Sequence, residues 1–259
     1  MNPIRRNFIY EIIILCFGTW LTGVSKAGFG GGIGMIVVPL FTQLRSPKGA
    51  LGLLLPILFS TDVISLGHYW KQWHRSSIWR LVPGAVIGIA LASFILKDIS
   101  NDHLKKVIGG IVCLFAVLEL FRSQLTHRLN PDAADKEPAV RIKAWHGVLL
   151  GIFAGIFSTL AHMAGPIIIM YLLTQKLGNR TFVATTTVLY FCINLTKIPV
   201  YFQAELFSME LLIETLVLLP FVALGVQTGV YLNSRFSEQN FSRIVLIVLF
   251  ATGIYLLFS

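Results

Sequence analysis

The sequence has few charged residues and few cysteines. Only 13% of its 259 residues are charged, whereas 55% are hydrophobic, and the mean hydropathy is +0.76. A soluble domain of this length could not bury so much apolar surface. The three cysteines stand singly inside apolar segments, without a CxxC pair or metal-like spacing. We therefore expect the cysteines to pack in the interior, and we expect no metal site.

The motifs of enzymes are missing as well. The sequence has no HExxH, no pair of acidic motifs and no GxxxxGK[ST] nucleotide motif, and its histidines are scattered over different loops. A membrane-embedded enzyme would need acid-base or metal-binding residues concentrated at one site. We accordingly predict no catalytic residues and no cofactor, and the missing nucleotide motif argues against a function driven by ATP hydrolysis.

Hydrophobic segments recur along the whole chain. About 18 apolar residues cross a hydrocarbon core of about 30 Å as a helix, and backbone groups cannot stay unpaired in lipid. The alternation typical of membrane strands is absent. We predict an all-α polytopic membrane protein with about eight transmembrane helices, over residues 8–41, 51–69, 78–96, 104–121, 145–173, 182–202, 211–232 and 241–258.

The net charge of +9 is better explained by membrane topology than by nucleic acid. Basic residues are spread over short loops and form no stripe interleaved with aromatic residues, so no nucleic-acid partner is expected. Because Lys and Arg accumulate in cytoplasmic loops, we place residues 71–80 and 122–143 in the cytoplasm. We expect the membrane to be the inner (plasma) membrane of the cell. A homo-oligomer is possible, and the sequence leaves the oligomeric state open.

The two halves of the chain resemble each other. We divide the chain into a first four-helix repeat at 1–122, a polar linker loop at 123–144 and a second four-helix repeat at 145–259. Small residues at every fourth position in the third and seventh segments are expected to serve helix packing. The aligned pairs are Pro83 with Pro220 and Gly88 with Gly225 at a separation of 137, Gly32 with Gly165 at 133 and Ala50 with Ala184 at 134.

The first helix of each repeat is predicted to be broken. Residues 28–34 contain five glycines, each costing a helix about 1 kcal/mol relative to alanine. In the second half, Gly165-Pro166 also interrupts a helix and can begin a new one. Paired interruptions indicate a transporter's binding site, and a half-helix beginning near Ile33 or Pro166 would direct free N–H groups at an anion. Alternatively, the glycines merely allow tight helix crossing.

Four ionisable residues lie inside apolar segments, where a charge is costly and is a functional candidate. Lysines beside free N–H groups would bind a small anion, unless they extend to a head group. Asp62 is expected to pair with a lysine or to exchange a proton, and His162 to donate a hydrogen bond. Near the midplane, the predicted substrate-binding residues are Lys26, Gly28, Gly30, Gly31, Gly32, Ser158, Thr159, His162, Gly165, Asn194 and Lys197.

The orientation of the halves depends on the broken segments. If residues 8–41 and 145–173 each cross once, the protein has eight crossings and parallel repeats. If both are re-entrant hairpins, the repeats are inverted, and the distribution of loop charges favours this arrangement. The 29 residues of the second segment, however, make about 44 Å of helix, which suits one tilted and broken crossing. We therefore expect eight crossings.

The chain resembles the sulfite and sulfonate exporters of the TauE/SafE family over nearly its whole length. The resemblance implies two repeats of four segments joined by a polar loop, and transport of sulfur-containing or related small organic anions. We predict a secondary transporter that exports such anions, with an anion channel as the nearer alternative. The residues that carry the resemblance are Gly23, Gly28 to Gly32 and Pro39, Gly165-Pro166 followed by residues 167–173, and Pro-x4-Gly from Pro83 and from Pro220. The chain departs from the family pattern at Ala161-His162-Met163-Ala164, where glycines are commoner.

Overall fold

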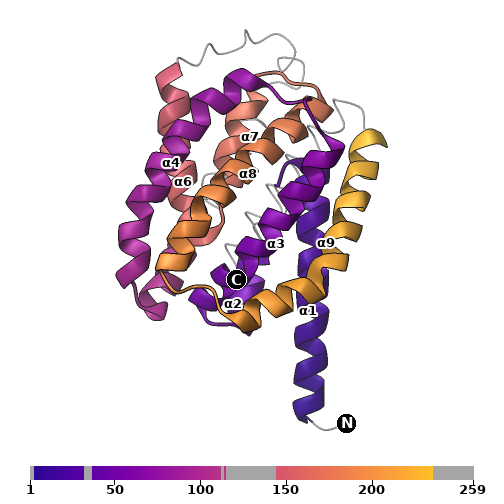
Figure 1. The fold of residues 1–259 in the computed structure, drawn as a ribbon, viewed down its shortest axis with the longest axis vertical. Helices are drawn as coiled ribbons and strands as arrows, with labels where there is room; N and C mark the ends of the chain where they lie inside the picture. The colour runs from indigo at the N-terminus through magenta and orange to yellow at the C-terminus, as the bar shows by residue number, and fades with distance from the viewer. Residues whose placement is uncertain (1–2, 32–36, 112–113, 115–143, 236–259) are drawn as a thin grey trace, which may run out of the picture.

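The computed structural model describes residues 3–31, 37–111, 114 and 144–235, which form helices and no strand (Figure 1). The all-α prediction is confirmed. The predicted segment at 104–121 is described only in part, and the one at 241–258 lies outside the described residues. In chain order the helices are α1 (Pro3–Phe29), α2 (Val37–Leu44), α3 (Pro47–His68), α4 (Arg75–Asp98), α6 (Ala144–Ala161), α7 (Gly165–Leu173), α8 (Asn179–Gln203) and α9 (Met209–Arg235).

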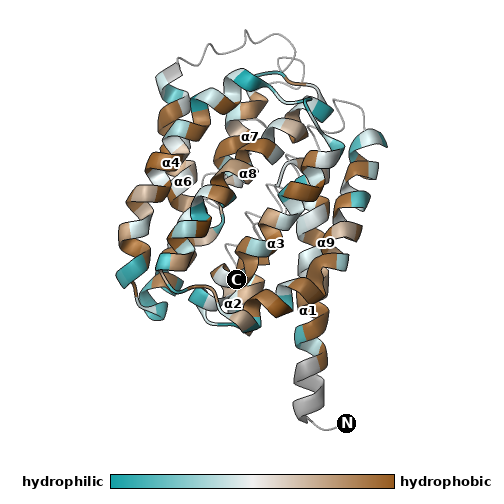
Figure 2. Cartoon of the chain, in the orientation of Figure 1, coloured by the Kyte–Doolittle hydropathy of each residue, from teal (hydrophilic) through white to brown (hydrophobic). Residues whose placement is uncertain are grey.

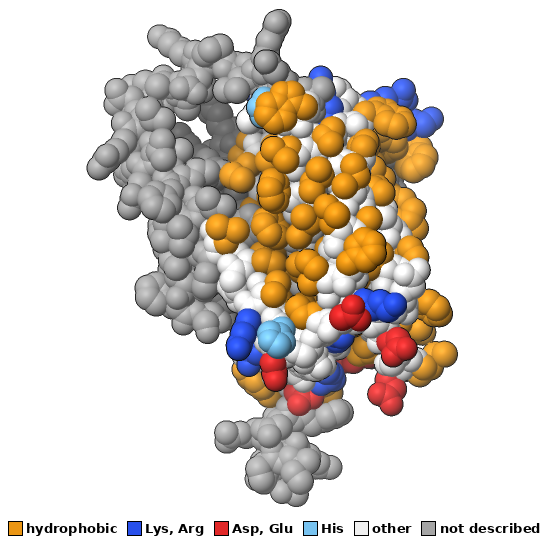
Figure 3. Space-filling view, turned by 90° about the vertical axis from the view of Figure 1, so that its left-hand side faces the viewer, with side chains coloured by type: hydrophobic (Ala, Val, Ile, Leu, Met, Phe, Trp, Pro, Cys, Tyr) orange, Lys and Arg blue, Asp and Glu red, His pale blue; other side chains and the backbone are white. Residues whose placement is uncertain are grey.

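The outside of the helix bundle is apolar. Trp79, Phe94 and Leu216 are large hydrophobic side chains that are 77%, 76% and 64% exposed, and side chains of this kind cover the middle of the face in Figure 3, with charged ones towards its ends. Brown hydrophobic residues dominate the long helices in Figure 2. Within the described residues, five helices are long and apolar enough to cross a bilayer: Ile9–Phe29, Pro47–His68, Arg75–Asp98, Asn179–Gln203 and Met209–Arg235. A polytopic membrane protein is the class that such a surface defines.

Two loops mark the opposite ends of the molecule. Residues 69–74 join α3 to α4 at what we name the α3–α4 end, at the top of Figure 1. Residues 204–208 join α8 to α9 at the α8–α9 end, at the bottom of that view. The helices α3, α4, α8 and α9 run between these two ends, and the broken segments α1–α2 and α6–α7 pack against them.

The first broken segment turns back on itself. Arg45, directly after α2, approaches Glu11 in the early part of α1, with Nη1 and Oε2 3.5 Å apart. A Cβ atom built on Gly18 would lie 2.7 Å from the ring of Phe41, so α2 runs back along α1. Both the start of α1 and the end of α2 therefore lie at the α8–α9 end.

The second broken segment does the same from the opposite side. The start of α6 lies beside the first turns of α4, because a Cβ atom on Gly147 would lie 2.8 Å from Cβ of Arg80. After α7, residues 174–178 lead into α8, where Thr185 Oγ1 accepts from the backbone N–H of His74 at 2.9 Å. Thus α6 begins and α7 ends at the α3–α4 end.

The expectation that each broken segment crosses once, with parallel repeats, is therefore wrong. The length expected for 145–173 assumes one nearly straight helix, whereas the chain reverses between α6 and α7. Because the two hairpins enter from opposite ends, the described halves run in inverted orientation, as the distribution of loop charges indicates. Ala144, the last residue of the predicted linker, already belongs to α6; the rest of the linker lies outside the described residues.

Helix pairing repeats between the halves. α1 runs along α9 and α4 runs along α6, in each case with backbones in close contact. A Cβ atom on Gly225 would lie 2.3 Å from the carbonyl oxygen of Trp20, and one on Gly88 would lie 2.0 Å from that of Ile152. The predicted packing role of these small residues is confirmed, since any larger side chain would separate the helices.

Candidate functional site

The two helix breaks have the same local geometry. Gly30 and His162 both adopt left-handed backbone angles, with φ of 68° and 53°. In each break an N–H then donates to a carbonyl oxygen six residues earlier, which closes the end of the preceding helix. The equivalent hydrogen bonds run from Gly31 N to Ser25 O (2.9 Å) and from Met163 N to Phe157 O (3.2 Å).

These equivalent residues stand 132 positions apart, as do Pro47 and Asn179 at the starts of α3 and α8. The structural register therefore differs by one or two residues from the alignment of Gly32 with Gly165 and of Ala50 with Ala184. The sequence alignment matched small residues, whereas the fold matches helix ends. A histidine consequently occupies the left-handed position that a glycine occupies in the first half, a conformation that is uncommon for residues other than glycine.

A buried ion pair lies where α1, α3 and α8 meet. Lys26 on α1 pairs with Asp62 on α3, and these residues are only 5% and 1% exposed. Asn194 on α8 donates its Nδ2 to Asp62 Oδ2 at 2.7 Å. The ammonium of Lys26 also lies 4.7 Å from the centre of the Tyr190 ring and 3.4 Å from the carbonyl oxygen of Leu58. Asp62 therefore neutralises Lys26, one of the two roles predicted for it.

The second lysine belongs to a different set of contacts. Lys197 on α8 is fully buried, and its Nζ donates to the carbonyl oxygen and to Oγ of Ser158, each at 3.1 Å. Its Nζ also lies 2.8 Å from Nδ1 of His162. Because an ammonium has no acceptor lone pair, Nδ1 of His162 accepts, and Nε2 carries the hydrogen that reaches the carbonyl oxygen of Leu51 at 3.1 Å.

Tyrosine hydroxyls close the carbonyl ends of the broken helices. Tyr69 donates to the carbonyl oxygen of Ala27 at 2.6 Å, and Tyr201 donates to that of Thr159 at 2.8 Å. These two bonds are again 132 positions apart. Tyr190 donates to the carbonyl oxygen of Gly30 at 2.9 Å. Carbonyl groups of both breaks are therefore hydrogen-bonded to tyrosine hydroxyls.

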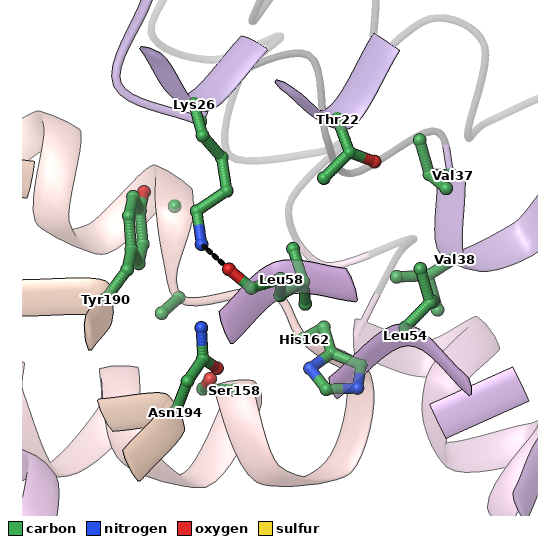
Figure 4. A pocket seen from close by; sticks show the side chains of 13 residues that line it. Thr22, Lys26, Val37, Val38, Leu54, Leu58, Ser158, His162, Tyr190 and Asn194 are labelled. Carbon is green, nitrogen blue, oxygen red and sulfur yellow. Dashed lines mark hydrogen bonds between the residues drawn. The ribbon is translucent and has the colours of Figure 1, made fainter. Parts of the chain in front are cut away.

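A cavity lies between the two breaks (Figure 4). Both half-helices begin at its wall: α2 contributes Val37 and Val38, and the start of α7 contributes Ala164 and Gly165. No side chain caps the first turn of α7. In Figure 4 the side chains of Lys26, His162 and Asn194 extend towards the same space. The full lining is Thr22, Lys26, Gly31, Val37, Val38, Leu54, Leu58, Ser158, His162, Ala164, Gly165, Tyr190 and Asn194.

Six of the residues predicted to bind substrate line this cavity: Lys26, Gly31, Ser158, His162, Gly165 and Asn194. Lys197 and Asp62 stand one layer behind them. Gly28 packs against Gly229 of α9, and the hydroxyl of Thr159 donates to the carbonyl oxygen of Gly155 in its own helix. Gly30 supplies the left-handed turn, and Gly32 lies outside the described residues.

Sequence reasoning missed the tyrosines. Tyr190, Asn194, Lys197 and Tyr201 follow one another at intervals of four, three and four residues, so they share one face of α8. That spacing could have identified Tyr190 and Tyr201, once Asn194 and Lys197 were candidates. The apolar lining residues, such as Val37 and Leu54, carry no such signal, because their sequence context is the same as that of core residues.

Within the described residues, a helical body with an apolar exterior, in which two half-helices begin at one cavity lined by a buried lysine, is typical of membrane transport proteins. The chain belongs to the TauE/SafE family: the family model described as "Sulfite exporter TauE/SafE" matches residues 15–256. Comparisons with curated proteins and with solved structures gave no match. The resemblance found in the sequence is thereby confirmed.

Proposed function

We propose that this protein is a secondary transporter of the inner membrane that exports a small oxyanion, such as sulfite or an organosulfonate, through the cavity between the two breaks. One observation carries the proposal: the first turns of α2 and α7 and the side chain of Lys26 line the same cavity. Helix N-termini present free N–H groups and a partial positive charge, which suit an anion.

The start of α7 is the better defined of the two N-termini. Ala164 and Gly165 line the cavity, and Pro166 occupies the first turn, where its missing N–H costs no hydrogen bond. The N–H groups at this start can donate to sulfonate oxygens, and the ammonium of Lys26 adds a charge-assisted contact. Asp62 would then share Lys26 with the substrate and hold its charge when the site is empty.

The size and the walls of the cavity support a compact anion. The volume of the cavity, counted as the space open to the centre of a water molecule, is about 40 Å³. A single bound water needs roughly 10–15 Å³ by the same definition. A sulfite or a sulfonate head group therefore fits. Val37, Val38 and Leu54 form an apolar side of the lining, which can contact the short carbon chain of an organosulfonate.

Flux measurements test this proposal. The purified protein is reconstituted in liposomes, and uptake of sulfite, sulfoacetate, taurine and methanesulfonate is followed against protein-free liposomes. We expect flux of at least one of these anions that saturates with its concentration, as for a carrier. Absence of flux above background for the whole panel would overturn the proposal, and single-channel currents would assign the protein to the channels instead.

A further inference from the structure

Lys197 is a buried lysine without a carboxylate partner among the described residues. It is fully buried, and its ammonium bonds to Ser158 and His162, which are neutral groups as the hydrogen bonds assign them. Lys26 differs in this respect, because Asp62 neutralises it. When Lys197 is protonated, one positive charge is therefore uncompensated among the described residues of the site. A buried, unpaired charge costs several kcal/mol, so it needs a bound anion or the loss of its proton.

Within the part of the chain that the structure describes, the other charged and titratable groups around Lys197 do not supply a compensating negative charge. His162, from the α6–α7 break, accepts from it at Nδ1, and the ring of Tyr201 on the same helix lies 5.5 Å away. Lys26 on α1 repels it, and Asp62 on α3 attracts it, but that carboxylate already serves Lys26 and Asn194. The nearest space for a compensating anion is the cavity, since Ser158 and His162 both line it.

The position of this ammonium also resembles that of a coupling ion. Carbonyl groups at the ends of broken helices coordinate Na⁺ in many secondary transporters. Here the carbonyl oxygen of Ser158, in the last turn of α6, accepts from Lys197 Nζ at 3.1 Å. A side-chain cation thus occupies the place of a free cation, and a lysine can lose its charge by releasing a proton, whereas Na⁺ must leave the site.

We propose that Lys197 carries the proton that accompanies the substrate, so that one monoanion crosses together with one proton and without Na⁺. The inference rests on the proposed function. Lys197 takes a proton from water on the side where the anion binds and returns it to water where the anion leaves; no other bond changes. The loaded site is then electrically balanced. Net flux is electroneutral, and export requires the product of the anion and proton concentrations to be higher inside than outside.

A lysine-to-arginine substitution separates binding from coupling, because a guanidinium stays charged. The probe is the anion of the panel that gives the highest flux. Protein-free liposomes measure the background flux of a weak acid such as sulfite across the lipid alone. Lys197→Arg should keep anion-for-anion exchange within about twofold but lower net uptake by about tenfold or more. Net uptake requires the empty site to return across the membrane, and arginine cannot release its proton to make that site neutral. Lys97→Arg, on the exposed end of α4, is the matched control.

Wild-type protein provides a second test that does not depend on how the variant folds. A pH dye inside the liposomes should report one proton entering with each anion, equally in sodium and in choline buffers, and unchanged when valinomycin and K⁺ set the membrane potential. Net anion uptake without proton entry, or net flux that follows potential or Na⁺, would overturn the inference and leave the proposed function standing. Absence of any anion flux would overturn both.

Discussion

Lys26 is the charged side chain that borders the cavity, and its contribution to binding can be separated from its ion pair. Lys26→Met alone leaves Asp62 as an unpaired buried charge, so we pair it with Asp62→Asn, which keeps the site neutral. We expect the double variant to fold and to bind the transported anion about tenfold or more weakly, because one charge-assisted contact is worth about 1.5–3 kcal/mol. Substrate-dependent tryptophan fluorescence or flux against concentration measures this loss.

The control for this prediction is Lys97→Met on the exposed end of α4, which should bind like the parent. A folded double variant with unchanged anion affinity would show that the Lys26–Asp62 pair is structural and that the cavity binds its ligand through other groups.

Gly31 is the residue whose replacement should stop transport most cleanly. Its φ of 92° is unfavourable for any side chain, and a Cβ atom there would lie 2.8 Å from the hydroxyl of Tyr190. Gly31→Val should therefore distort the break and reduce flux to background, while membrane insertion survives. Gly67→Val is the matched control, because a Cβ atom on Gly67 meets nothing within 4 Å. Equal flux in the two variants would contradict this role.

At the scale of helices, the glycines of α4 hold the α4–α6 pair together. A Cβ atom on Gly88 would overlap the carbonyl oxygen of Ile152, so Gly88→Leu forces the two helices apart. Overpacking of this kind costs typically 1–3 kcal/mol, which corresponds to a fall in Tm of roughly 3–10 °C. Thermal unfolding of the detergent-solubilised protein, monitored by size-exclusion chromatography, measures this change in Tm.

Gly110→Leu provides the comparison for that experiment, since no atom of the described residues lies within 4 Å of a Cβ atom built on Gly110. Its Tm should stay near that of the parent. Should both variants lose the same stability, the effect would come from leucine at a glycine and not from the α4–α6 contact.

At the scale of the whole molecule, the hairpins determine which loops share a side of the membrane. With inverted halves, Ser208 lies on the same side as Asp102 and opposite Gln72; with eight single crossings it would share the side of Gln72. Ser208→Cys, Asp102→Cys and Gln72→Cys, each made alone on a background without native cysteines, test this. A membrane-impermeant thiol reagent applied to intact cells should label Ser208→Cys and Asp102→Cys and spare Gln72→Cys. Labelling of Asp102→Cys alone would restore the eight-crossing arrangement.

Much of the fold follows from sequence, because helix formation in a membrane is a local matter. The apolar segments had to become helices to satisfy their backbone groups, and the glycines at 28–32 and Gly165-Pro166 had to interrupt them. Lys26, Asp62 and Lys197 stand inside such segments, where a charge is costly, so their positions in the chain alone make them functional candidates.

The tertiary structure determines how these local features are arranged in space and which residues become partners. A left-handed residue at Gly30 and at His162 reverses the chain, and hydropathy cannot distinguish a reversal from a bend. The register of 132 between the breaks, the pairing of Asp62 with Lys26, and the place of Lys197 behind Ser158 and His162 all depend on which helices come together. Such contacts join residues far apart in the chain, so composition and periodicity identify the charged residues but not their partners.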